Sequence, residues 1–321
     1  MIKEIKSHID RSTSVAVLCH INSDGDALSS SYALADVLSA MGKEVVCILE
    51  EEPGEKYNFL GGEYCVYTGG EVKEYDLCIA VDCGDAARLG KRIEIFNKAK
   101  CTLNIDHHKT NDSFGMLNVV KPTYCAAAEV LTELFEDMGI TLSDNAARLL
   151  YAGIMSDSGC LKFSSTSSRT HILVAKLLEH NFDHAEVTRL LFDSYSMELT
   201  RLTGYVMSQI ECYENGLITL ISTDDALLKK YGVDETDANI LINIPRRIKG
   251  SEIAIELKER GGVVRVSLRS NGRADVNRVA GLFGGGGHEK AAGATFDGKT
   301  LDEAKELLLE AAVAELKRSV L

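Results

Sequence analysis

The segment Leu103-Asn104-Ile105-Asp106-His107-His108-Lys109-Thr110-Asn111 decides how the rest of this chain is interpreted. An apolar run that ends at Ile105 predicts a short buried strand, followed at once by a carboxylate and two imidazoles. Adjacent histidines are costly to bury without a use, because each ring must place two nitrogen atoms. At the carboxyl end of a strand they would face the crevice in which open α/β sheets bind ligands, where one imidazole can bind a metal while the other acts on the molecule that the metal holds. A pair of solvated loop histidines is the alternative that this segment alone leaves open.

Two further apolar runs are also followed by acids or histidine. Val15–Cys19 and Leu77–Val81 are continuous apolar stretches, which predicts strands that are buried on both faces of a parallel sheet. The polar residues that follow these runs are His20, Asp24, Asp26 and Asp82. Because the carboxyl ends of parallel strands meet at one edge of a sheet, we expect a shared metal cluster there. For residues 20–26 alone, a helix N-cap region with a surface histidine is the alternative.

A predicted helix supplies one more carboxylate. Residues Asp144 to Met155 have helical periodicity and begin at a Ser-Asp capping signal. The helix runs into Asp157 and a glycine-containing loop, where Asp157 by itself would be a residue without a role. Next to the other acids it becomes a candidate for the last ligand. Carboxylate oxygens combined with imidazole suit Mn²⁺ or Mg²⁺ better than Zn²⁺, which favours thiolate.

The length of 321 residues and a change of pattern at Leu217 predict two domains. Residues 1–190 alternate strands with helices, which favours an α/β domain with a doubly wound, mostly parallel sheet. Residues 191–214 are helical in pattern without a strand, and we expect them to connect the domains. Residues 215–321 predict a smaller α/β domain, which would face the first across a cleft. Its expected strands are Leu217–Ser222, Glu252–Lys258 and Val263–Ser270.

The smaller domain carries Gly284-Gly285-Gly286-Gly287-His288 after a predicted helix from Asp275 to Phe283. Glycine loses the most backbone entropy on folding, so we expect this run to serve a purpose other than packing. A backbone without side chains permits the close approach of a ligand, with amide groups that point at an anion. A flexible linker is the alternative. The small-residue stretch Ala291–Ala294 and the histidine favour a binding loop.

The net charge of −13 argues against tight binding along long nucleic acid, which needs rows of cations. A small anionic substrate remains compatible with this charge, because a metal partly neutralises the acids that hold it. The nine cysteines are scattered without a CxxC pair, which predicts free thiols in a reducing cytosol. We find no apolar signal segment at the N-terminus and no apolar run of membrane-spanning length. We therefore expect a cytoplasmic protein without a membrane partner.

These motifs, in this order, resemble the DHH phosphoesterase superfamily. The matching segments are His20-x-Asn22-x-Asp24-Gly25-Asp26-Ala27, Val81-Asp82, Asp106-His107-His108 and Asp157. The glycine run, with Ala291-Ala292-Gly293 and the upstream Ser267-Leu268-Arg269-Ser270, resembles the superfamily's associated C-terminal domain. Length and layout are similar to those of the NrnA-type nanoRNases and 3′-phosphoadenosine 5′-phosphate phosphatases. The chain departs from the family at Ser23, usually proline, and at Ser29, usually glycine, and neither change removes a ligand.

The resemblance implies two Mn²⁺ ions, with Mg²⁺ or another divalent ion as the alternative. The implied ligands of the first ion are His20, Asp24 and Asp82. Those of the second are Asp26, Asp82, His107 and Asp157, so that Asp82 bridges the two. Asp106 would orient a histidine, and His108 would contact the scissile phosphate as a donor or proton-transfer group. The implied substrate-binding residues are Arg269, Ser270, Gly285, Gly286, Gly287 and His288.

The function that the resemblance implies is the hydrolysis of very short oligoribonucleotides to 5′-mononucleotides, together with the dephosphorylation of 3′-phosphoadenosine 5′-phosphate. Hydrolysis of cyclic dinucleotides or their linear products relies on the same chemistry and stays open. A nucleotide-binding sensor with an inactive metal site is a third alternative, against which the complete set of ligands argues. The expected partner is a short oligoribonucleotide or dinucleotide, and a homodimer is left open as the oligomeric state.

Overall fold

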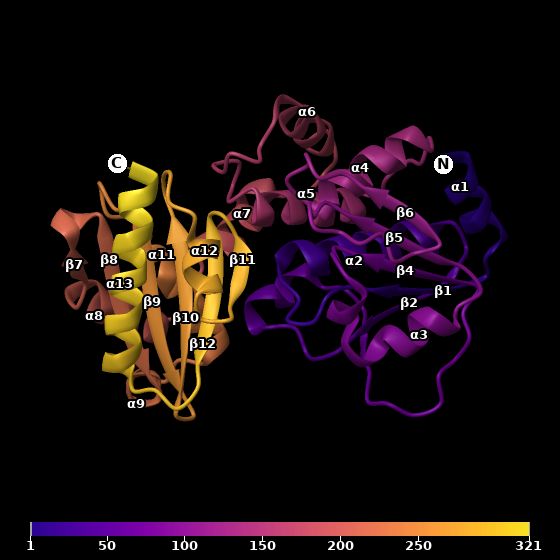
Figure 1. Cartoon of the computed structure of the whole chain (residues 1–321). Helices are drawn as coiled ribbons and strands as arrows, with labels where there is room; N and C mark the ends of the chain where they lie inside the picture. The colour runs from indigo at the N-terminus through magenta and orange to yellow at the C-terminus, as the bar shows by residue number, and fades with distance from the viewer. Residues whose placement is uncertain (1, 321) are drawn as a thin grey trace. The chain divides into compact units, whose positions relative to one another are not determined.

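The computed structural model describes residues 2–320 and contains two compact units, Met1–Ser194 and Tyr195–Leu321 (Figure 1). Each unit has its own six-stranded sheet and its own hydrophobic core. The segment 191–214 contains the helix α8 (Met197–Ser208) and the short strand β7 (Glu211–Tyr213), both within the second unit. The expectation of a strand-free segment is therefore wrong at β7. Among the described residues, no helix is long and apolar enough to cross a membrane.

The first sheet is parallel throughout, with the strand order β3-β2-β1-β4-β5-β6. Its strands are β1 (Ser14–Leu18), β2 (Glu44–Leu49), β3 (Cys65–Val66), β4 (Leu77–Val81), β5 (Thr102–Asp106) and β6 (Leu117–Val120). From β1 the chain winds outward through β2 and β3, then returns to β4 and winds the other way. The predicted doubly wound sheet is thus confirmed. Its switch point lies between β1 and β4, where such sheets bind ligands beyond the carboxyl ends of the strands.

Alternate residues of each strand pack into different cores, as expected for a sheet that helices cover on both faces. Val15 and Val17 face the larger core, whereas Ala16 and Leu18 face the smaller one. The larger core is built with the helices α1 (Ile2–Arg11), α2 (Gly25–Ala40), α4 (Ala127–Asp137), α5 (Asp144–Asp157), α6 (Ser168–Leu177) and α7 (His184–Phe192). The smaller core includes α3 (Ile93–Lys98) and the 3-10 segment η2 (Ala86–Arg92). A second 3-10 segment, η1 (Glu55–Leu60), packs against the larger core.

The second sheet is mixed, with the order β11-β12-β10-β9-β8-β7. Only β8 and β9 pair in parallel, and the other neighbours are antiparallel. Besides β7, its strands are β8 (Ile218–Asp224), β9 (Ile253–Arg260), β10 (Val263–Ser270), β11 (Gly286–His288) and β12 (Ala291–Phe296). The predicted glycine loop is therefore a strand from Gly286 onward, a correction that follows from its pairing with β12.

The two faces of the second sheet differ in chemistry. Val264, Val266 and Leu268 of β10 pack into a core with α12 (Val276–Gly281) and α13 (Leu301–Val320). The intervening residues Arg265 and Ser267 lie on the opposite face. Part of that face is covered by a smaller core formed by α8, α9 (Asp225–Tyr231), α10 (Glu235–Ala238), η4 (Asn239–Ile242) and α11 (Asn243–Arg246). On this face of the sheet, the polar residues of β10 thus lie between the helices of this smaller core on one side and strand β12 on the other.

Candidate metal centre

The carboxyl ends of β1, β4 and β5 bring the predicted polar residues to one edge of the first sheet. Asp82 directly follows β4, and Asp106 is the last residue of β5. His20 follows β1, which is the neighbour of β4 in the sheet. Asp82 has a φ of 55°, a left-handed conformation that costs a residue with a side chain on the order of 1–3 kcal/mol. Backbone strain at this point is consistent with a functional requirement on the direction of the Asp82 carboxylate.

His20 lies between two carboxylates. Its Nε2 atom is 3.7 Å from Oδ2 of Asp24 and 3.6 Å from Oδ2 of Asp82. Its Nδ1 atom lies 2.7 Å from the carbonyl oxygen of Ile21, which can only accept, so Nδ1 carries a hydrogen. Asp24 uses its other oxygen, Oδ1, to accept from two backbone amides in the first turn of α2. In both His20 and Asp24, one side-chain atom is thus held by hydrogen bonds to the backbone, and another faces the cluster.

His107 forms the centre of a second group. Its Nε2 atom is 3.3 Å from Oδ1 of Asp82 and 3.4 Å from Oδ2 of Asp157. Its Nδ1 atom lies 3.2 Å from the carbonyl oxygen of Tyr124, which fixes the ring in the same manner as that of His20. Asp26 completes the group, because Asp26, His107 and Asp157 each offer a ligand atom within 4.8 Å of the others. Asp82 therefore presents one oxygen to each histidine.

Asp26 is held more firmly than the other acids. It is fully buried, and its Oδ2 atom accepts from the amide of Ala127 at 2.6 Å. Its Oδ1 atom accepts from the amide of Ala128 at 3.0 Å and from Oγ of Ser30 at 2.9 Å. The two amides belong to the N-terminus of α4, where the helix dipole favours a negative charge. A carboxylate anchored in this way cannot easily rotate out of the cluster.

Two buried atoms at the centre of the site have no hydrogen-bond partner among the described residues: Oδ1 of Asp82 and Nε2 of His107. Leaving a buried polar atom unsatisfied costs ~1–3 kcal/mol, so this arrangement needs a reason. Both atoms are electron-pair donors of the type that binds divalent cations, and they lie 3.3 Å apart. The residues therefore fit a metal ion as the missing partner.

The pKa values of the site residues also indicate that the site fits a metal ion. Burial acts to lower the pKa of His20, but Asp24 and Asp82 outweigh it and raise that pKa to about 11. Burial likewise opposes protonation of His107, and Asp82 in particular raises the pKa of its ring to about 10. Burial and the nearby Asp82 raise the pKa of Asp26 to about 7. The cluster thus retains protons that offset its crowded carboxylates, and a divalent cation can take the place of that positive charge.

His108 is organised differently from the other two histidines. Its Nδ1 atom is 2.7 Å from Oδ1 of Asp106, a buried carboxylate whose other oxygen accepts from the amide side chain of Asn111. Burial tends to raise the pKa of Asp106, but the bonds from His108 and Asn111 outweigh it and lower that pKa. Asp82, Asp106, His107 and His108 also lie close enough together to hold an ion. The short bond to Asp106 nevertheless occupies the ring nitrogen of His108 that faces Asp82.

In the second unit, the predicted substrate-binding residues come together across three strands. Arg269 of β10 is in register with Ala291 of β12, and Ala291 is in register with His288 of β11. Ser270 ends β10, and its buried Oγ atom has no hydrogen-bond partner among the described residues. Arg269 is partly buried, and this burial, with Arg246 nearby, lowers the pKa of its guanidinium. The register thus places a guanidinium and an imidazole on either side of a small residue.

The fold of the unit explains some glycines of the run but not all of them. A Cβ atom on Gly285 would lie 2.2 Å from the carbonyl oxygen of Gly293, and one on Gly287 would lie 2.5 Å from that of Ala291. These two glycines are needed because the backbone passes close to β12, which corrects the expectation that packing does not explain the run. A Cβ atom on Gly286 would meet nothing closer than 3.8 Å. The fold of the unit therefore does not explain this glycine.

Two residues that support the site were not found from the sequence. Ser30 donates to Asp26 from one turn further along α2. Gly153 of α5 lies so close to Asp26 that only a residue without a side chain fits there. The two are separated by more than a hundred residues in the chain and form no motif. The available signals were the position of Ser30 directly after Ser29 in the first motif and the small-residue composition of the two helices, which also suits ordinary close helix packing.

Comparison with known proteins places these features in context. Residues 14–154 match the model of the DHH family, N-terminal domain, and residues 216–317 match that of the DHHA1 domain. A "Bifunctional oligoribonuclease and PAP phosphatase NrnA" from Thermus thermophilus is 34% identical over 95% of this chain and 91% of its own length. A "Probable bifunctional oligoribonuclease and PAP phosphatase NrnA" from Streptococcus mutans is 30% identical over 91% of this chain and 92% of its own length.

Solved structures extend this likeness. An exopolyphosphatase-related protein from Bacteroides fragilis has a TM-score of 0.92 and 26% identity, and the match covers 98% of this chain and 95% of that one. The fold is also similar to that of RecJ from Thermus thermophilus, crystallised in complex with Mn²⁺, with a TM-score of 0.57 and 15% identity. That match covers 98% of this chain but only 54% of the RecJ chain.

Proposed function

Because this chain belongs to the DHH family of phosphoesterases, we propose that it is a hydrolase that releases 5′-mononucleotides from very short oligoribonucleotides and dephosphorylates 3′-phosphoadenosine 5′-phosphate. The observation that carries the proposal is the position of Asp82, whose two oxygens face His20 and His107 in separate groups. A shared carboxylate between two ligand groups is the arrangement expected of a two-metal phosphoesterase. The names of the relatives supply the class of substrate.

The ions are proposed to be Mn²⁺, held in one group by His20, Asp24 and Asp82 and in the other by Asp26, Asp82, His107 and Asp157. Two divalent ions held by these residues would supply charge stabilisation for both the attacking and the leaving oxygen of a phosphoryl displacement. The protein's own contribution is to fix the ligands beforehand. Asp26 is anchored at the α4 N-terminus, and both imidazoles are oriented by backbone carbonyl groups.

His108 is proposed to act on the substrate and not on the metal. Its Nδ1 hydrogen points to Asp106, which sets the orientation of the ring and leaves Nε2 as the atom that exchanges a proton with the phosphate or the leaving oxygen. Asp106 stabilises the protonated ring without itself accepting the proton, because the bonds from His108 and Asn111 keep its pKa low. Asp106 thus serves as a positioning residue.

The second unit is proposed to bind the part of the nucleotide that lies away from the reacting phosphate. Arg269 can form charge-assisted hydrogen bonds to a phosphate group, and His288 is in the same register row. Gly286 supports this assignment, because nothing within the unit requires its lack of a side chain. We propose that a substrate backbone passes close to this glycine.

One assay panel tests the function. The purified protein is incubated with Mn²⁺ and, separately, with the linear dinucleotide pApA, 3′-phosphoadenosine 5′-phosphate, a cyclic dinucleotide, pyrophosphate and a long oligoribonucleotide. We expect the highest specificity constants for the first two substrates. Preferred turnover of the cyclic dinucleotide would replace the proposal with a cyclic dinucleotide phosphodiesterase, and binding without turnover of any compound would favour a sensor.

A further inference from the structure

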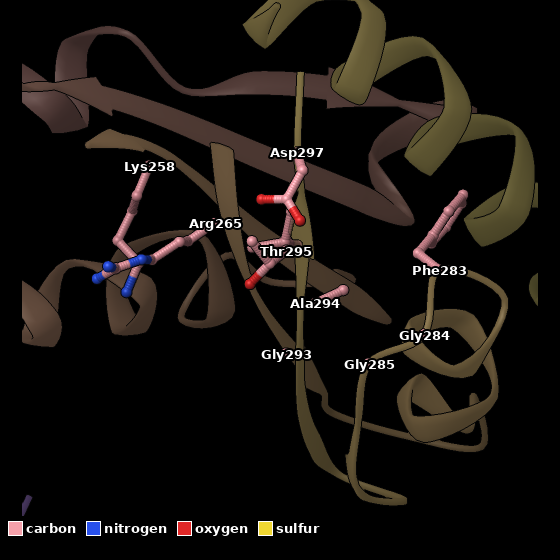
Figure 2. Close-up of a pocket in the computed structure, with 10 residues that line it drawn as sticks. Lys258, Arg265, Phe283, Gly284, Gly285, Gly293, Ala294, Thr295 and Asp297 are labelled. Carbon is pink, nitrogen blue, oxygen red and sulfur yellow. The ribbon is translucent and has the colours of Figure 1, made fainter. Parts of the chain in front are cut away.

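The second unit contains a cavity of about 540 Å³ that does not include Arg269, Ser270 or His288 (Figure 2). Its size is within the range of ~300–1,000 Å³ that is usual for small-ligand sites. It lies around the C-terminal half of β12, at the far end of the β9–β10 hairpin from Arg269. The lining residues that matter for its chemistry are Lys258, Arg265, Phe283, Gly285, Thr295 and Asp297.

Two cations form one side of this cavity. Lys258 and Arg265 are in register across the antiparallel β9–β10 pair, so their side chains extend from the same face of the sheet (Figure 2). Nη1 of Arg265 is 3.0 Å from Glu235, and Nζ of Lys258 is 3.2 Å from Oδ1 of Asn239. A guanidinium has five donor hydrogens and an ammonium has three, so these contacts orient both groups without using all their donors. The Arg265 side chain is also 54% exposed, which leaves it accessible to a ligand.

Thr295 and the outer edge of β12 form the middle of the cavity. Thr295 is in register with Arg265, so its hydroxyl lies on the same face of the sheet as the Arg265 side chain. Strand β11 pairs with β12 only as far as Gly293. Beyond Gly293, no described strand pairs with the outer edge of β12, although Gly285 lies close to Ala294 there. Asp297 is the one acidic residue of the lining, and it follows the strand.

The position of the cavity relative to Arg269 suggests its ligand. Arg265, Ser267 and Arg269 are alternate residues of β10 and share one face, so the Cα atoms of the two arginines are four residues, or ~13 Å, apart along the strand. A single mononucleotide does not carry two phosphates at that separation, whereas a chain of a few nucleotides does. We infer that the cavity is a distal phosphate subsite, which binds a later phosphate of an oligonucleotide whose first nucleotide is held at Arg269. This inference rests on the proposed function.

The subsite should make affinity depend on substrate length. A dinucleotide anchored at Arg269 would not reach Lys258 and Arg265, whereas a trinucleotide or tetranucleotide would. Each phosphate contact to a single strand contributes a slope of about −0.7 to the dependence of log affinity on log salt concentration. The longer ligands should therefore bind more tightly and with a steeper salt dependence.

The test measures binding and not turnover, so that it does not depend on the proposed activity. Fluorescently labelled oligoribonucleotides of two, three and four residues are titrated into the full chain in the presence of a chelator. The double variant Lys258→Ala/Arg265→Ala is compared with wild type, and Arg265→Lys serves as the conservative variant. Arg318→Ala is the matched control, because Arg318 is also paired with a glutamate, on α13 over the other face of the sheet.

In wild type we expect the tetranucleotide to bind about tenfold more tightly than the dinucleotide, because it gains at least one charged contact. The double variant should lose this gain and reduce the salt slope for the tetranucleotide by ~0.7 or more, while dinucleotide binding stays unchanged. Arg265→Lys should retain most of the gain, and Arg318→Ala all of it. Equal losses at all lengths, or no loss at any length, would overturn the subsite. No binding of any oligoribonucleotide by wild type would also overturn the subsite, whereas the assay panel with Mn²⁺ decides the proposed function separately.

Discussion

Gly153 of α5 approaches Asp26 of α2 so closely that a Cβ atom on the glycine would lie 2.7 Å from Oδ1 of the aspartate. The carboxylate cannot move away, because the amides of Ala127 and Ala128 and the hydroxyl of Ser30 hold it. The packing of two helices thus determines where one candidate ligand stands. We therefore expect metal binding at the site to depend on a residue that is not itself a candidate ligand.

Gly153→Ala should therefore weaken the metal centre. Overpacking of a close helix contact costs ~1–3 kcal/mol of stability, and here the two closest atoms are Cβ of Ala128, at 2.6 Å, and Oδ1 of the candidate ligand Asp26, at 2.7 Å. We expect a loss of Mn²⁺ affinity in calorimetric titration and a lower unfolding temperature. The control is Gly204→Ala in α8, where an added Cβ atom meets nothing within 4 Å and alanine favours the helix. An unchanged Mn²⁺ affinity in Gly153→Ala would contradict the coupling between helix packing and the site.

Asp82→Ala should remove a ligand from both groups at once. We expect elemental analysis to find a large loss of bound Mn²⁺ and the pApA assay to detect no turnover. The strand that precedes Asp82 is fully buried and apolar, so the fold should persist. Asp112→Ala removes an exposed carboxylate from the loop after His108 and should change neither quantity. Wild-type turnover without the Asp82 carboxylate would reject the two-metal assignment.

His108→Ala should separate catalysis from metal binding. If the ring transfers a proton at Nε2, the variant keeps its Mn²⁺ content and loses roughly 10²–10⁴-fold in kcat, as is usual for a proton-transfer group. His171→Ala removes an exposed histidine of α6 and serves as the control. A His108 variant that lost Mn²⁺ together with activity would show that this ring is a ligand.

Two adjacent glycines, Gly285 before β11 and Gly286 at its start, offer a matched pair of variants. Gly285→Ala places a Cβ atom 2.2 Å from a backbone oxygen, so we expect it to destabilise the second unit by at least ~1–3 kcal/mol. Gly286→Ala has room for the Cβ atom and should leave stability within ~0.5 kcal/mol of wild type. Its kcat/KM for pApA should nevertheless fall, because the methyl group occupies the space proposed for the substrate backbone. Unchanged kcat/KM in Gly286→Ala would remove this glycine from the substrate site.

The strands that the sequence predicted are those that can be recognised from a run of apolar residues alone. The prediction for β4, Leu77–Val81, has the observed bounds because all five residues are buried and apolar. The strands β3 and β6 were missed, since runs of two and four residues carry no period that distinguishes a strand from a loop. They exist because a neighbouring strand pairs with them. The strand β11 was missed for a related reason: glycine disfavours strands in general, and only the close approach of β12 requires it here.

The candidate site, like the strands, could be predicted only in part from the sequence. Acids and histidines at strand ends can be read from the chain, because strand order and direction bring such ends together. The groups that hold them cannot be read in this way. Asp26 depends on amides of α4 and on Gly153 of α5, and these contacts arise only when three helices pack. Orientation of the ligands is thus a property of tertiary structure, whereas their identity is a property of sequence.

The last prediction concerns a buried carboxylate of the second unit outside the candidate site. Glu256 of β9 is fully buried, and neither oxygen has a hydrogen-bond partner among the described residues. Burial raises the pKa of its carboxyl group from 4.5 to about 7, although Lys258, Arg260 and Arg269 act in the opposite direction. Because the folded protein binds this proton more tightly than the unfolded chain does, Glu256 favours folding below pH 4.5, and that contribution is lost as the pH rises through 7. The loss should amount to on the order of 3 kcal/mol.

Glu256→Gln cannot ionise, so we expect it to match wild type in urea unfolding at pH 5 and to exceed it in stability at pH 8. Glu259→Gln on the same strand changes an exposed carboxylate and should show no such difference. Equal stability of wild type and Glu256→Gln at pH 8 would mean that the buried carboxylate is stabilised in its charged form after all.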